Sequence, residues 1–204
     1  MLRPSVLLAL LSLSAFAQGQ QTPEARVPHL TPIFPFDHDG KESAVFHSII
    51  GDRNPSLWMI ARPSLGFRAE YAVLVFAIPI PNGEPDPFRD ISGYDWVIET
   101  AEITDRVTKE VSRVRASIPN DLGKRITSAW NSVLDETRYS KHQQRGLDGV
   151  TVQFGTQSKA GEIWSPQWGP PGRLFQLGQA LMAIATAPES DRDRQIQACS
   201  TLAE

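Results

Sequence analysis

Residues 149–185 read GVTVQFGTQSKAGEIWSPQWGPPGRLFQLGQALMAIA, and this stretch decides the fold. Its first residues alternate apolar with polar side chains, which is the period of a half-buried strand. A polar loop at 157–161 then leads into a second strand, as expected of a hairpin. Pro166, Pro170 and Pro171 end that strand, because proline removes the backbone donor that a central ladder needs. The stretch therefore predicts two strands followed by a helix.

The helix is indicated by Leu174, Leu177, Leu181 and Ile184, which recur every three or four residues. This spacing is typical of a helix with one apolar face. Prolines are tolerated in the first turn of a helix, where their missing amide would be unpaired anyway. We expect the helix to span about 171–186 and to pack on the sheet.

The rest of the chain predicts further strands, at residues 45–50, 57–61, 67–80 and 94–98. Residues 105–118 combine helical spacing with many β-branched side chains; we favour a strand there, and a helix stays open. Pro119-Asn120-Asp121 opens a second helix, at about 120–137. The fold class expected is α+β: a single domain with a mainly antiparallel sheet of about five to seven strands and two helices packed on it.

The N-terminus is typical of a signal peptide at residues 1–17. Arg3 is positive, residues 6–13 are apolar, and Ala15-Phe16-Ala17 is a small-x-small cleavage site. We predict cleavage after Ala17 and an exported protein, periplasmic or secreted. Residues 18–36 are proline-spaced and predict an extended arm, 37–187 the α+β domain, and 188–204 a polar tail.

The composition and net charge of the chain limit the classes of molecule that it is expected to bind. The chain has 204 residues, of which 41% are hydrophobic, and a formal net charge of −3 with scattered basic residues. Nucleic acid is therefore an unfavourable partner. Nothing after the first 17 residues approaches a membrane span. The single cysteine, Cys199, cannot form an internal disulfide, so stability must come from the core.

Catalytic and metal-binding patterns are weak. The sequence has no Gly-x-Ser-x-Gly elbow, and its four histidines (His29, His38, His47 and His142) have no spacing that puts two rings on one helix face. Asp37 to Glu42 is the densest group of potential ligands, but a solvated turn fits it better than a calcium loop. We expect neither a metal nor a cofactor.

Five acidic residues lie on or near the predicted strands, and glycosidases need only two carboxylates at a suitable separation. Each is expected to lie on a solvated face. They leave open an alternative function, a small hydrolase acting on cell-envelope polymers. The five are Asp95, Glu99, Glu102, Asp148 and Glu162.

The strongest binding character belongs to Trp164 and Trp168, which flank Ser165-Pro166-Gln167, with Arg173 at the start of the helix. Tryptophan and arginine are the usual energetic anchors of interfaces. For Trp164 we favour a place in the core, whereas for Trp168 two interpretations stay open, a binding surface or a contact that holds the loop on the helix. We favour a non-enzymatic binding protein, a monomer or weak oligomer, that holds an unknown protein or envelope component.

Overall fold

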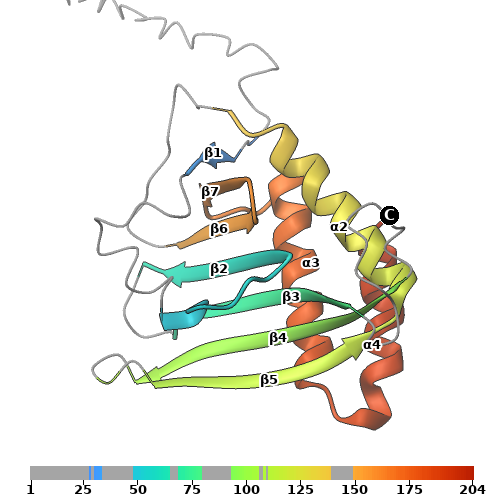
Figure 1. The fold of residues 1–204 in the computed structure, drawn as a ribbon. Helices are drawn as coiled ribbons and strands as arrows, with labels where there is room; N and C mark the ends of the chain where they lie inside the picture. The colour runs from blue at the N-terminus through green and yellow to red at the C-terminus, as the bar shows by residue number, and fades with distance from the viewer. Residues whose placement is uncertain are drawn as a thin grey trace, which may run out of the picture.

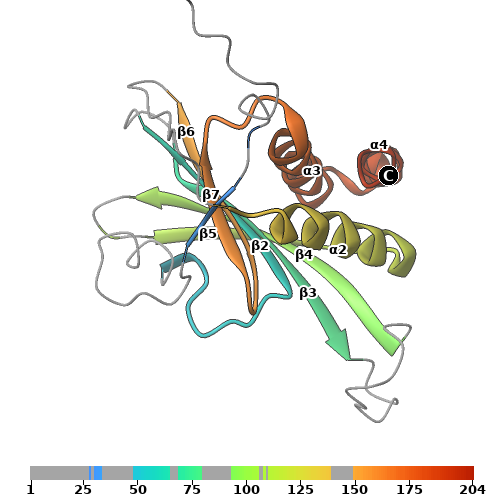
Figure 2. The same cartoon turned by 90° about the horizontal axis from the view of Figure 1, so that it is seen from above.

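The computed structural model describes residues 28, 30–33, 48–64, 69–79, 93–105, 108, 110–138 and 149–204. These residues form one seven-stranded sheet in the order β1-β7-β6-β2-β3-β4-β5, and every neighbouring pair is antiparallel. Three described helices lie on one face of the sheet (Figures 1 and 2). The elements are β1 (Thr31–Pro32), β2 (Leu57–Pro63), β3 (Tyr71–Pro79), β4 (Tyr94–Asp105), β5 (Glu110–Ile118), α2 (Asn120–Asp135), β6 (Val150–Thr156), β7 (Ala160–Trp164), α3 (Gly169–Thr186) and α4 (Glu189–Leu202).

This architecture confirms the expected α+β class with its antiparallel sheet. Both predicted helices are present, as α2 and α3, and α4 is a third. The open question is resolved in favour of a strand at 110–118, since β5 pairs with β4 from Trp96↔Ile118 to Ile103↔Val111, while 106, 107 and 109 lie outside the described residues. The β-branched side chains of this segment therefore outweigh its helical spacing.

The central strands β2 and β3 are buried on both faces. Residues 57–61 of β2 and 72–75 of β3 are all buried. Alternate side chains of these strands point toward the helices, and the others point toward the opposite face. A strand that is covered on both sides needs an apolar run without alternation, which is what both segments have.

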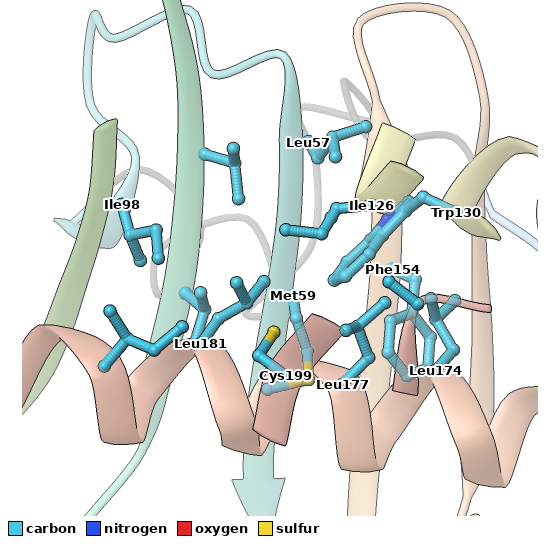
Figure 3. Packing of buried hydrophobic residues seen from close by; sticks show 14 of the residues in the cluster. Leu57, Met59, Ile98, Ile126, Trp130, Phe154, Leu174, Leu177, Leu181 and Cys199 are labelled. Carbon is cyan, nitrogen blue, oxygen red and sulfur yellow. The ribbon is translucent and has the colours of Figure 1, made fainter. Parts of the chain in front are cut away.

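The main core lies between the sheet and the helices. Figure 3 shows Leu57, Met59 and Phe154 of the sheet in this core, together with Ile126 of α2 and Leu177 of α3. Trp130 of α2 meets the Phe154 ring edge-on at a centroid distance of 5.7 Å, a favoured aromatic geometry.

A second apolar cluster covers the opposite face of the sheet. It consists of Ile49, Ile50, Trp58, Ile60, Ala72, Leu74, Ala101, Ile103 and Ala160. Ser48 and Ile49 are helical, so the strand expected at 45–50 is wrong at these positions, while 45–47 lie outside the described residues. The chain turns at Gly51, whose φ is +58°, and this lets both isoleucines lie over the sheet instead of pairing with it.

The segment expected to be a polar tail forms α4 and joins the core. Cys199 is fully buried beside α3, and burial raises the pKa of its thiol to about 11. The thiol is therefore protonated at neutral pH. Arg125 of α2 fastens α4 by donating to the carbonyl and the Oγ of Ser200, at 3.3 and 3.2 Å.

The described end of the proline-spaced arm also packs on the domain. Leu30 is 1% exposed within the main core, and Thr31–Pro32 pairs with β7 as the edge strand β1. The predicted signal peptide lies outside the described residues. No described helix is long and apolar enough to cross a membrane.

Gly123 of α2 is in close contact with the sheet. A Cβ built there would lie 2.3 Å from Cδ2 of Trp96, and that indole is buried and donates from Nε1 to Asn120 Oδ1 at 3.0 Å. Alanine normally stabilises a helix relative to glycine by about 1 kcal/mol. Here we predict that Gly123→Ala lowers the free energy of unfolding by about 1–3 kcal/mol, because the rigid ring must shift.

Urea denaturation measures this change, with the exposed Ser128→Ala of the same helix as the control. Ser128→Ala should leave stability unchanged or raise it slightly. A Gly123→Ala protein that is more stable than the parent would contradict the described packing of α2 on β4.

Candidate functional site

The turn between β7 and α3 forms one side of a half-open pocket of about 260 Å³. Figure 2 shows the chain crossing here from the sheet to the helix layer. The pocket is lined by Pro28, Ile163, Trp164, Ser165, Pro166, Gln167 and Trp168. Both tryptophans predicted from the sequence therefore line it.

The start of the turn is fixed by Ser165. Its φ of +46° is unusual for a residue other than glycine. The Ser165 amide donates to the carbonyl of Val150 at 2.7 Å, which extends the β6–β7 pairing by one bond. Pro166 follows and is buried, and its ring restricts the backbone further. The chain thus leaves the sheet in one defined direction.

The end of the turn is fixed by Gly169. Its φ is +71° and a Cβ there would lie 2.9 Å from Cγ of Pro28, so both the backbone conformation and the space favour glycine. Pro170 and Pro171 then occupy the first turn of α3, as the sequence predicts. Gly172 lies against the Gln167 backbone, because a Cβ would come within 2.9 Å of the carbonyl carbon. The turn is therefore packed on the helix that follows it.

The two tryptophans differ in exposure. Trp168 is 57% exposed, although it immediately precedes α3. Trp164 is half-buried, and its ring lies against Gly149, where a Cβ would be 2.5 Å from Cζ2. The Nε1 of Trp164 is buried and has no acceptor among the described residues. Arg173 is exposed on α3 and does not line the pocket.

The lining is uncharged. Its seven residues offer apolar and aromatic surface, one hydroxyl and one amide. A general acid or base would need a titratable side chain within reach of the substrate, and the lining residues supply none. The described lining residues thus offer surface for apolar and aromatic contact.

The acidic residues do not assemble a catalytic pair in the described part of the chain. Glu99 was expected on a solvated face, but its side chain is 0% exposed and is paired with Arg53, Arg113 and Arg115. The expectation is wrong because the face of β4 away from the helices is covered by the second apolar cluster and by these arginines. Asp95 and Glu102 are exposed.

Glu162 accepts from Gln153 Nε2 at 3.4 Å on the neighbouring strand. Asp148, the acidic cluster Asp37 to Glu42 and all four histidines lie outside the described residues. The described residues contain no group of three or more His, Cys, Asp or Glu side chains arranged to hold a metal ion.

Comparison with known proteins gives no relative: no protein-family model, curated protein or solved structure matches the chain.

Proposed function

We propose that this chain is an exported, non-enzymatic binding protein whose pocket at 163–168 receives an apolar side chain from an extended segment of a partner protein. The observation that carries the proposal is a 57% exposed Trp168 beside a rigid, uncharged pocket of about 260 Å³. Export, to the periplasm or outside the cell, rests on the signal-peptide pattern at 1–17.

The size of the pocket favours a side chain over a whole small molecule. Sites for cofactors and drug-sized ligands enclose roughly 300–1,000 Å³ and carry placed polar or charged groups. This pocket is smaller, and its lining residues have no charge. A single leucine, proline or aromatic side chain matches its dimensions and chemistry.

The rigidity of the turn favours recognition of a protein segment. Pro166, Pro170 and Pro171 restrict the backbone around Trp168, so little entropy is lost when a partner docks. Covering the exposed part of a tryptophan of this kind is worth roughly 2–3 kcal/mol.

The alternative is a small hydrolase acting on envelope polymers, and no observation on the described residues favours it. Glu99, the most buried of the described candidate carboxylates, is neutralised by arginines. The pocket lining contains no carboxylate.

We predict that Trp168→Ala weakens capture of the partner by the immobilised protein at least roughly tenfold, because a central tryptophan anchor contributes about 2 kcal/mol or more. The measurement is recovery from an extract of the native host, followed by titration with the identified partner. Arg173→Ala tests whether the neighbouring helix surface contributes. Gln197→Ala, exposed on α4, is the control and should bind normally.

Equal binding by the parent and the Trp168→Ala protein would exclude the turn as the recognition surface. If a polysaccharide is recovered in place of a protein, the assigned class of partner is wrong.

The export part of the proposal is tested separately by mass spectrometry of the protein from its host. A chain that begins at Gln18 is expected, and one that retains Met1 to Ala17 would contradict it.

A further inference from the structure

On the sheet face opposite the helices, one buried carboxylate is surrounded by three guanidinium groups. Glu99 of β4 is 0% exposed at its side chain. Arg113 Nη1 donates to Glu99 Oε1 at 2.8 Å, and Arg115 Nε donates to Oε2 at 2.5 Å. Arg53 Nη1 also donates to Oε1. We call these four residues the Glu99 cluster.

The backbone places all four side chains on this face. Glu99 and Arg115 are direct partners in the β4–β5 register, and Arg113 lies two residues from Arg115, so it points to the same side. Arg53 comes from the turn after Gly51, where its amide donates to Ile50 O at 3.2 Å. The cluster is thus assembled by two neighbouring strands and one turn.

Among the described residues, the charges of the cluster do not balance. Three guanidinium groups and one carboxylate sum to +2, and Glu99 is the one carboxylate that these arginines contact among the described residues. A single arginine is enough to neutralise a buried carboxylate. The pKa of Arg113 is lowered by burial and by the charge of Arg53, which agrees with positive charge that Glu99 does not fully offset.

Two of the arginines keep donors available at the surface. The side chain of Arg115 is 65% exposed and that of Arg53 is 33% exposed. Each uses one nitrogen on Glu99, and their other N–H groups have no acceptor among the described residues. Arg113 differs, because its Nη2 donates to the carbonyls of Ile49 and Ser48 at 2.8 and 3.3 Å. Arg113 therefore anchors the 48–50 segment, while Arg53 and Arg115 present N–H edges to solvent.

We propose that the Glu99 cluster is a binding site for a tetrahedral dianion of the phosphate class, held by Arg53 and Arg115. Glu99 orients both guanidinium groups before the ligand arrives, so the ligand does not have to order two flexible side chains. Planar arginine forks bind phosphate oxygens in a bidentate manner. A dianion balances the excess of two charges, whereas a carboxylate would leave one positive charge on the cluster.

This site is separate from the tryptophan pocket. The Glu99 cluster lies on β4 and β5 at one edge of the sheet, and the pocket lies beyond β7, next to the other edge. Loss of one function therefore leaves the other measurable.

The test is calorimetric titration of the protein with inorganic phosphate, at mildly alkaline pH and at an ionic strength held constant with chloride. Saturable binding to one site is expected. Arg115→Gln, at the most exposed arginine of the cluster, leaves Glu99 paired with two arginines and should weaken phosphate binding roughly tenfold. Arg53→Gln should do the same. Arg194→Gln is the control, because Arg194 is 75% exposed on α4 and should bind phosphate as the parent does.

Three further titrations define the ligand. Sulfate should compete with phosphate, and acetate should not. Phenyl phosphate that binds more tightly than inorganic phosphate indicates a phosphomonoester as the natural ligand, and the reverse order indicates free phosphate; either order supports the site. Circular dichroism verifies that each variant is folded.

Absence of phosphate binding by the folded parent would overturn the proposal, and would mean that the cluster serves only to fasten the 48–53 segment to the sheet. An equal loss in the Arg194→Gln protein would assign the effect to general charge. Acetate that binds as tightly as phosphate would overturn the assignment to a dianion.

Discussion

The structure depends on the two-sided burial of β2 and β3. Strands that are apolar on both faces are stable only when both faces are covered. The helices cover one face, and Ile49 and Ile50 with their neighbours cover the other. Among the described residues this second cover is a short segment and not a layer of long helices, so it needs additional contacts to hold it on the sheet. Arg113 supplies them by bonding both Glu99 and the carbonyl of Ile49.

The same constraint positions the tryptophan turn. α3 lies so close to the sheet that a Cβ at Gly178 would come within 2.4 Å of Sδ of Met59 on β2. Such close packing of the Gly178 backbone on the buried Met59 leaves α3 little freedom to slide along the sheet. The first turn of α3 is therefore fixed relative to β7. The short connection at 165–168 has to pass from the sheet to the helix layer in one conformation. The exposure of Trp168 is a consequence of that crossing.

Features set by local chemistry could be predicted from the sequence. The alternation of apolar and polar side chains predicted β6, and apolar residues three and four apart predicted α2 and α3. The prolines after Trp164 predicted a rigid turn that carries Trp168. The strand expected at 45–50 was wrong at Ser48 and Ile49, because a short apolar run fits a strand or a covering turn equally well. α4 was not foreseen as a core helix, since its 14 residues are mostly charged or polar and bury chiefly Cys199.

The Glu99 cluster could not be predicted in the same way. Its arginines lie 46, 14 and 16 residues from Glu99 in the sequence, and no spacing rule connects them. Only the register of β5 on β4, together with the path of the chain after Gly51, brings them together. Each of the four residues lies in a local sequence that is typical of a solvated strand or turn.

The central claim is that the turn at 164–168 contacts another molecule in the cell, and site-specific photocrosslinking in the native host tests it most directly. A photoreactive residue is placed at Gln167, exposed between the two tryptophans, and in a second strain at Gln197, exposed on α4. We expect irradiation to give one discrete protein adduct from position 167 and none from position 197. No adduct from position 167, or the same adducts from both positions, would contradict the claim.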